Sequence, residues 1–308
     1  LGKGHLVREI DALDGVMGDV ADKSGIQFRL LNRSRGPAVR GPRTQSDRSL
    51  YKKHMQNTLL NYENLTVEAD PVIKFLFYEN KVTGFICESK KQVFCKELIL
   101  TTGTFLNGLI HIGLKQIPAG RFNEKPSTGL SEQLEKYNII LGRLKTGTPP
   151  RLDGKSINYE DIEMQPADNE PYFFSFLTNK LKNKQISCGV THTNNEVHKI
   201  INENIHLSAM YSGNIKGVGP RYCPSIEDKI VKFKEKQQHQ IFLEPEGLND
   251  STIYPNGIST SLPEEVQLKL LSKIKGLEEV KMIRAGYAIE YDYVDPRELN
   301  ATLETKKI

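Results

Sequence analysis

The sequence predicts an α/β protein, and two patterns in it carry that prediction. Apolar residues recur at three- and four-residue steps in several stretches, which is typical of amphipathic helices. Short β-prone runs separated by polar turns form a meander between residues 72 and 95. The chain has 308 residues, 38% of them hydrophobic and 26% charged, which is enough to bury one large core or two modest ones.

The sequence of the N-terminal part predicts two helices, with a strand and a turn-rich loop between them. Helical spacing is seen at Leu6, Ile10, Leu13, Val16 and Val20. We therefore expect one helix over residues 6–21. A strand is expected over residues 26–31 and a further helix over residues 47–61. Two Gly-Pro pairs between them indicate turns.

The meander is expected to contain strands over residues 72–78, 82–87 and 93–95. The apolar run that follows, residues 98–103, predicts a buried strand that ends at glycine. In nucleotide-binding flavoproteins such a strand closes the FAD-binding sheet, and the glycine lets the chain pass close to the cofactor. Thr102 and Gly103 are therefore candidate cofactor-binding residues, although a strand that ends at glycine is also a common structural stop.

A second region is expected to begin near residue 149. From about Gly142 the composition shifts toward Pro, Asn and Lys, and Thr148-Pro149-Pro150-Arg151 forms a stiff boundary. A later helix is expected over residues 263–274.

Several function classes are excluded by what the sequence lacks. No run of about 18 apolar residues occurs, so no membrane-spanning helix is predicted. The four cysteines are too scattered for a disulfide framework and form no CxxC pair, so we expect a reducing compartment and no zinc. The histidines show no metal-ligand spacing. Lys145-Thr146 lacks the preceding glycine of a phosphate-binding loop, so GTP hydrolysis is not expected here.

The net charge of +4 is mild, but basic residues concentrate between residues 29 and 53. This basic segment holds one acid, Asp47, against Arg29, Arg33, Arg35, Arg40, Arg43, Arg48, Lys52 and Lys53. It favours phosphate groups, and a solvated basic face is the alternative. Arg40 and Arg43 lie in a loop of small residues, where forked donors could hold a pyrophosphate or an RNA phosphate. Residue types alone do not choose between these two anions.

Cys223 is the candidate nucleophile. It lies in a loop rich in glycine and proline, two residues after Arg221, and a nearby cation lowers a thiol pKa and favours the thiolate. A lone cysteine is more often inert. Cys87 and Cys95 fall in the meander, where burial would raise a thiol pKa, and Cys188 lies in a polar stretch without a comparable motif.

Six segments resemble, in the same order, the signature segments of the GidA/MnmG family of tRNA-modifying flavoenzymes. They are GKGHLV at residues 2–7, GPAVR at 36–40, RLKTGTPPR at 143–151, GPRYCPSIE at 219–227, LEPEG at 243–247 and YPNGIS at 254–259. The resemblance covers essentially the whole chain. It implies an FAD-binding Rossmann-like flavoprotein fold with a β-meander and an inserted mixed α/β domain.

The resemblance also implies an activity. Family members use FAD, reduced by NADH, to build an aminomethyl-type group on C5 of the wobble uridine of tRNA, with methylenetetrahydrofolate as the one-carbon donor. They act as homodimers with a GTPase partner of the MnmE type. The attached amine is taurine in the mitochondrial branch and glycine or ammonium in bacteria. Residues 31–56 look more like mitochondrial members, so a mitochondrial location is expected, with the bacterial cytoplasm as the alternative.

Carried onto this chain, the resemblance implies three parts and a set of site residues. Residues 1–148 become a partial FAD-binding domain with the meander, 149–220 the inserted domain, and 221–308 a nicotinamide-binding region that returns to the FAD domain. Cys223 becomes the catalytic thiol, and no metal is implied. The expected cofactor-binding residues are Lys3, Gly4, Arg40, Arg43, Val72, Thr102, Gly103, Ser127, Gly219, Pro220, Arg221, Tyr222 and Ser225.

Both termini are expected to be truncations. The amino-terminal GxGxxG loop, a second functional cysteine, a later glycine-rich FAD segment and the carboxy-terminal domain that meets the GTPase are absent from the sequence, so the chain alone is expected to be inactive. A generic FAD/NADH oxidoreductase is one rival, but it needs a redox-active CxxC or CxxxxC pair, which this sequence does not contain. A non-catalytic tRNA-binding or assembly module is the other, and flavin absorbance of the complete protein would separate it from an enzyme.

Overall fold

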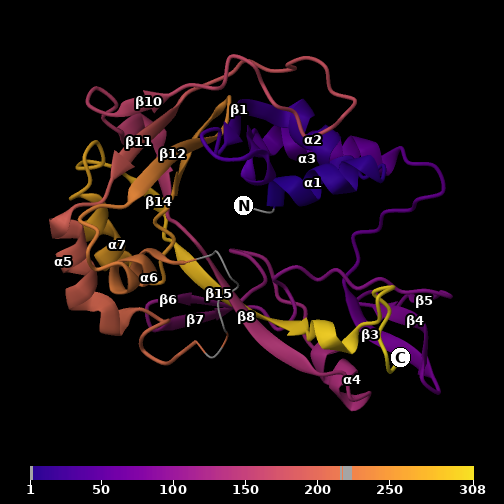
Figure 1. Ribbon diagram of the computed structural model, residues 1–308. Helices are drawn as coiled ribbons and strands as arrows, with labels where there is room; N and C mark the ends of the chain where they lie inside the picture. Colours follow the sequence, from indigo (N-terminus) through magenta and orange to yellow (C-terminus); the bar gives the residue numbers. More distant parts are fainter. Residues whose placement is uncertain (1–2, 216, 218–223) are drawn as a thin grey trace.

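The computed structural model describes residues 3–215, 217 and 224–308. In this part of the chain, helices lie against four separate antiparallel sheets of two, three, four and six strands (Figure 1). The prediction of an α/β protein is therefore confirmed.

The N-terminal unit packs three helices beside a two-stranded sheet. Its elements are α1 (Lys3–Ala12), α2 (Val16–Ser24), β1 (Gly25–Leu31), a 3-10 turn (Pro37–Val39), β2 (Gly41–Ser46) and α3 (Arg48–Leu60). The single helix expected over residues 6–21 is wrong. Asp14 takes a left-handed backbone (φ 66°), and the Gly15 N–H donates to the Ile10 carbonyl at 2.8 Å, so a tight turn ends the first helix.

The expected β-meander is confirmed. It consists of β3 (Val72–Tyr78), β4 (Lys81–Cys87) and β5 (Gln92–Phe94), which pair in sequence order. Helix α4 (Leu130–Lys136) packs against β3. The small core between them is formed by Phe75, Leu106, Leu130, Leu134 and Ile139.

The buried strand expected over residues 98–103 is wrong. These residues are irregular, Ile99 is 86% exposed, and none of the described strands pairs with them. An apolar run becomes a strand only where a neighbouring strand satisfies its backbone N–H and C=O groups. The described part of the chain supplies no such neighbour at this place.

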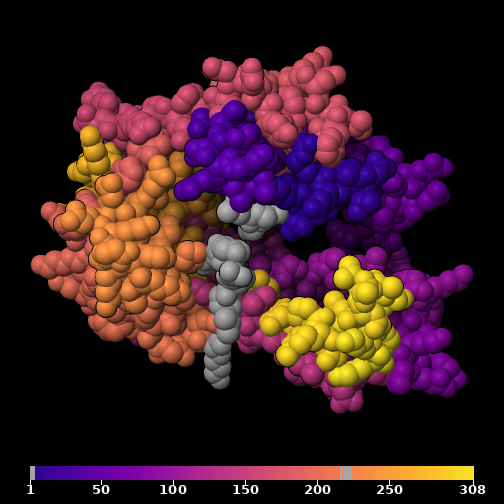
Figure 2. Space-filling view, viewed as in Figure 1, coloured from indigo at the N-terminus to yellow at the C-terminus, as the bar shows by residue number. Residues whose placement is uncertain are grey.

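The four-stranded sheet joins the middle of the chain to its C-terminal part. Its order is β7 (Lys115–Pro118), β6 (Leu109–Ile112), β15 (Tyr287–Val294) and β8 (Leu141–Thr148). Strands β8 and β15 pair along their whole length, from Tyr287 opposite Thr148 to Val294 opposite Leu141. The N-terminal helices lie away from the C-terminal residues, and Figure 2 shows the surface hollowed between them.

The six-stranded sheet carries the largest core. Its order is β10 (Glu163–Gln165), β11 (Cys188–His192), β12 (Gln240–Gly247), β13 (Asp250–Asn256), β9 (Arg151–Asp153) and β14 (Met282–Arg284). Helices α5 (Asn195–Asn204), α6 (Ile226–Lys232) and α7 (Glu264–Leu271) gather beside it (Figure 1). Short 3-10 turns lie at Gly154–Ser156, Ile205–Leu207 and Pro296–Glu298. The sheet takes strands from both sides of residue 220, and the expected three-part division stays a prediction.

Among the helices of the described ranges, none combines the length and the apolar character that crossing a membrane requires.

Two isoleucines of the six-stranded sheet make a matched test of its core. Ile241 on β12 is 0% exposed, whereas Ile283 on β14 is 56% exposed. Ile241→Ala should lower the free energy of unfolding by about 2–5 kcal/mol, because it leaves a cavity. Ile283→Ala should change it by less than about 0.5 kcal/mol. Urea denaturation measures both, and equal losses would show that β12 does not lie in the core.

Candidate functional site

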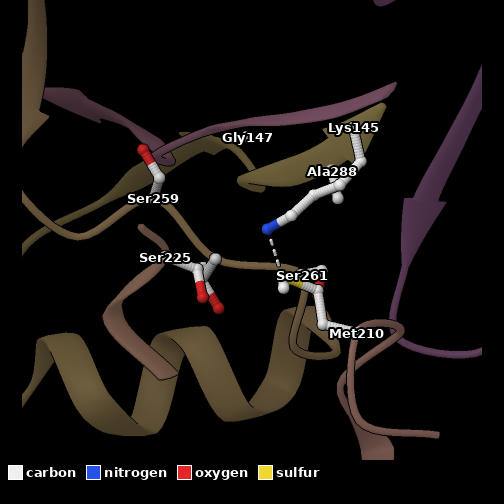
Figure 3. A pocket seen from close by; sticks show the side chains of 8 residues that line it. Lys145, Gly147, Met210, Ser225, Ser259, Ser261 and Ala288 are labelled. Atoms are coloured by element: carbon white, nitrogen blue, oxygen red, sulfur yellow. Dashed lines mark hydrogen bonds between the residues drawn. The ribbon is translucent and has the colours of Figure 1, made fainter. Parts of the chain in front are cut away.

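A small pocket opens between β8, the start of α6 and the segment that precedes α7. It is lined by Lys145, Gly147, Met210, Ser225, Ser259, Thr260, Ser261 and Ala288. Figure 3 shows the Lys145 side chain extending through it to the sulfur of Met210. Gly147 and Ala288 lie opposite each other on β8 and β15, and their small size leaves this space open.

The start of α6 places a charged carboxylate beside this pocket. Ser225 caps the helix: its Oγ accepts from the Asp228 N–H at 3.1 Å, and its N–H donates to Asp228 Oδ2 at 3.2 Å. The same Oδ2 lies 3.7 Å from Lys145 Nζ, and the Tyr211 hydroxyl donates to Oδ1 at 3.3 Å. Burial raises the pKa of Asp228, but Lys145 and the Ser225 N–H outweigh it and hold that pKa below its usual value. Asp228 is therefore ionised at neutral pH.

A second carboxylate, Glu227, belongs to the same helix, α6, and is 0% exposed. Its Oε1 accepts hydrogen bonds from three donors, the hydroxyls of Ser208 (3.0 Å) and Thr260 (3.1 Å) and the Ser261 N–H (3.0 Å). Its Oε2 is buried and finds no hydrogen-bond partner among the described residues. One oxygen is thus held rigidly, which fixes where the other one points.

A third carboxylate, Glu290 on β15, connects two buried groups. Its Oε2 lies 2.9 Å from His111 Nε2, and its Oε1 accepts from the Gly217 N–H at 2.7 Å. Burial lowers the pKa of His111, Glu290 opposes this effect, and Arg143 adds to it. The neutral ring donates its Nε2–H to Glu290, and its buried Nδ1 has no partner in the part of the chain that the structure describes.

Two of these carboxylates bind described residues that lie, along the sequence, on either side of Cys223, the candidate nucleophile. Glu290 binds Gly217, and Asp228 binds Ser225. The predicted site residues between them, Gly219, Pro220, Arg221, Tyr222 and Cys223, lie outside the described residues. Their roles stay predictions.

Four of the predicted FAD contacts, Val72, Thr102, Gly103 and Ser127, lie in residues 72–139, the part of the chain with the meander and its small core, here called the meander unit. Ser127 accepts from the Asn107 N–H and donates to the Phe105 carbonyl, both at 2.8 Å. The Phe105 N–H in turn donates to the Thr102 carbonyl at 3.0 Å. Gly103 follows with φ 57° and no atom within 4 Å of where a Cβ would stand, and Val72 packs against the core that contains Leu106.

The remaining predicted contacts lie in the N-terminal unit. Lys3 is the first residue of α1, and Gly4 follows it, so close to the Pro42 carbonyl that a Cβ would stand only 2.5 Å from that oxygen. Arg40 is exposed and donates to the Arg35 carbonyl at 3.1 Å. Arg43 is held in an ion pair with the buried Glu244. A ligand that binds Arg43 would therefore have to share the Arg43 guanidinium with Glu244.

Two of these carboxylates, Asp228 and Glu290, carry signals in the sequence that the motifs above do not include. Ser225 followed three residues later by Asp228 is a capping-box pattern, which predicts the start of a helix. Glu290 stands in the otherwise apolar start of β15, where an acidic residue needs a partner. The partner, His111, is distant in sequence, so no local pattern could identify it.

The architecture places the chain in the α/β class represented by solved GidA structures from Aquifex aeolicus. One crystal form matches with a TM-score of 0.93 and 50% identity over 99% of this chain and 52% of that chain. A second form gives a TM-score of 0.91 and 47% identity over 99% and 50%. The family model for glucose inhibited division protein A matches residues 1–308, and the chain belongs to this family.

Two curated relatives carry the name tRNA uridine 5-carboxymethylaminomethyl modification enzyme MnmG. The one from Granulibacter bethesdensis is 51% identical over 311 residues, and the one from Thermodesulfovibrio yellowstonii is 53% identical over 308 residues. Each alignment covers 100% of this chain and 49% of the relative. The chain therefore spans about half the length of the relatives it matches.

The buried His111 predicts a pH effect with a defined sign. Its folded-state pKa lies below 6.5, so the unfolded chain binds this proton more readily, and its contribution to stability is lost as the pH falls below that value. His111→Gln keeps a donor for Glu290 but does not titrate. Between pH 7.5 and 5 the wild type should lose more unfolding free energy than the variant, by about 1.4 kcal/mol for each unit of pKa lowering.

Urea denaturation at both pH values measures this difference. His206→Gln, at an exposed position, is the control and should follow the wild type. If the His111 variant also follows the wild type, the imidazole is not neutral in the folded protein.

Proposed function

We propose that the complete protein containing this chain modifies C5 of the wobble uridine of tRNA with an aminomethyl-type group. FAD would be its cofactor, NADH the reductant and methylenetetrahydrofolate the one-carbon donor. The observation that carries this proposal is identity of 51% and 53%, over the whole of this chain, to two enzymes named for tRNA uridine modification.

The residues of the meander unit fit a flavin-binding role. Thr102 and Ser127 are joined through Phe105 by backbone hydrogen bonds, and the Gly103 bend is open around its Cα. A ligand can approach a glycine backbone at such a bend more closely than it can any other residue. FAD bound there would supply the redox chemistry of the reaction. The stretch 219–233, of which Ser225 and α6 are described, is proposed to bind the nicotinamide.

The chemical role of a thiol follows from the substrate. C5 of uracil is a weak nucleophile, and addition of a thiolate to C6 shifts electron density to C5, which can then attack a one-carbon unit. Among the described cysteines, burial raises the pKa of Cys188 to about 11, and burial together with Asp70 raises the pKa of Cys87. Both are poor nucleophiles at neutral pH. This supports Cys223 as the catalytic thiol.

The polar residues beside the pocket have positioning roles in this proposal. Glu290 fixes Gly217 and Asp228 fixes Ser225, so each holds one side of the Cys223 segment. Glu227, two residues after Ser225, has a buried carboxylate oxygen with no partner within the described ranges. An acid or base fixed in this way could exchange a proton with a bound substrate.

The proposed partners follow from the family and from the exposed cations. We propose tRNA as substrate, a homodimer, and an MnmE-type GTPase bound through a carboxy-terminal domain beyond this chain. A mitochondrial location stays a prediction, with the bacterial cytoplasm as its alternative, and both of the relatives compared above are bacterial. Fluorescent tagging of the complete protein would decide the compartment.

Replacing the thiol tests the mechanism. Cys223→Ser in the complete protein should lower the rate of uridine modification by about 10²-fold or more, because a nucleophile is lost. FAD content, NADH oxidation and tRNA affinity should stay at wild-type levels. Mass spectrometry of the tRNA nucleosides measures the modification.

Cys95→Ser is the matched control, since Cys95 is partly exposed and lies in the meander. It should keep wild-type modification. Retained modification in the Cys223 variant would remove that thiol from the mechanism, whereas loss of NADH oxidation would place it in the nicotinamide site instead.

Two exposed lysines test the tRNA surface. Lys52 and Lys53 lie on α3 and point to solvent, unlike Arg43, which is paired. Lys52→Glu with Lys53→Glu should weaken tRNA binding and lower the slope of log affinity against log salt by about 1 for each phosphate that the protein no longer neutralises. The flavin spectrum should not change. Unchanged tRNA affinity across salt concentrations would leave these lysines as a solvated helix face.

A further inference from the structure

The carboxylate of Glu246, on β12, is shared by two arginines that come from different parts of the fold. Arg151 on β9 donates through its Nε to Glu246 Oε1, and Arg48 on α3 places its NH1 3.5 Å from Oε2. Arg151 is also held by the Thr148 hydroxyl at 3.0 Å and the Pro149 carbonyl at 2.7 Å. Its guanidinium lies over the Tyr254 ring, 4.2 Å from the centroid.

A third arginine stands directly beside this pair. Arg284 on β14 is the cross-strand partner of Arg151 in the antiparallel β9–β14 pair. Its guanidinium stacks over Phe122 at 5.1 Å from the centroid. Among the described residues, its buried Nε has no hydrogen-bond partner, and no carboxylate forms an ion pair with its guanidinium. Like charges placed directly opposite each other on neighbouring strands destabilise a sheet.

The three arginines therefore carry more positive charge than Glu246 can balance. Burial lowers the pKa of Arg284, and Arg151 and Arg48 lower it further, while Tyr287 and Glu246 act in the opposite direction. Two other partly buried arginines of the described chain each have a carboxylate of their own: Arg43 pairs with Glu244, and Arg143 with Asp292. A half-buried cation such as Arg284, without a carboxylate partner among the described residues, costs stability unless an anion binds to it.

We propose that Arg48, Arg151 and Arg284 form a binding site for a phosphate-type oxyanion. The rings of Phe122 and Tyr254 back the guanidiniums of Arg284 and Arg151. Arg151 already donates through Nε and NH1, so Arg284 supplies the forked donor that phosphate oxygens accept, and Arg151 adds positive charge beside it. The Arg48 side chain is 63% exposed, so it lies on the solvent side of the site. The anion is delivered either by the pyrophosphate of a dinucleotide or by an RNA backbone phosphate.

Binding of inorganic phosphate tests the site directly. Isothermal titration at low millimolar phosphate, with sodium chloride at equal ionic strength as the reference, should show saturable binding to the wild-type complete protein. Arg284→Gln and Arg48→Gln should each raise the dissociation constant by about tenfold or more, which corresponds to about 1.4 kcal/mol. Arg48 is exposed, so its variant tests the site even if Arg284→Gln does not fold.

Two further variants separate a binding site from a structural role. Glu246→Gln removes the competing carboxylate and should tighten phosphate binding, opposite in sign to the arginine variants. Arg297→Gln, at a side chain that is 87% exposed and paired with Asp295, is the control and should bind phosphate as the wild type does. Absence of saturable binding in the wild type, or equal binding by wild type and arginine variants, overturns the proposal.

Competition identifies the source of the phosphate. Displacement of inorganic phosphate by ADP-ribose assigns the site to a dinucleotide, and displacement by an anticodon stem-loop RNA assigns it to tRNA. None of these measurements involves uridine modification, so their failure would leave the proposed function standing, and failure of the Cys223 test would leave the anion site standing.

Discussion

The pairing of β8 with β15 is the constraint on which the rest of the structure depends. Its register sets Arg143 opposite Asp292 and Lys145 opposite Glu290, so each cation of β8 faces an acid of β15. Arg143 NH1 lies 2.6 Å from Asp292 Oδ1. A slip of one residue would turn every side chain of one strand to the opposite face and separate these opposite charges. Register and charge pairing therefore stabilise the same arrangement.

Two acids of one segment fasten the N-terminal unit to the six-stranded sheet. Glu244 and Glu246 both lie on β12, and they meet Arg43 of β2 and Arg48 of α3. Asp47 adds a third tie, because its Oδ2 accepts from the Leu248 N–H at 2.8 Å. Burial raises the pKa of Glu244 and Arg43 opposes it, so this carboxylate depends on its partner to stay ionised. Two ion pairs and a hydrogen bond therefore join the N-terminal unit to the six-stranded sheet at this segment.

Local patterns predicted much of the fold, and long-range pairing accounts for what they missed. The meander and α3 were predicted because short β-prone runs, polar turns and helical spacing are written in consecutive residues. The break at Asp14 and the irregular run around Ile99 were missed, since a tight turn and the absence of a pairing strand leave no periodic signal. The pocket at Lys145 could not be predicted either, because its walls come from segments distant from one another in the sequence.

The basic segment shows why charge along a sequence differs from charge in space. It contains one acid, Asp47, yet Arg29 and Arg33 both pair with Asp168, at 3.1 and 2.7 Å. Arg43 finds its acid still further along the chain, at Glu244. These arginines stabilise contacts between segments, and their charge is largely neutralised before any ligand arrives. The number of basic residues in a stretch of sequence does not show which arginines are paired with a carboxylate and which are available to a ligand. The number of guanidiniums for each carboxylate at a contact in the structure does show it.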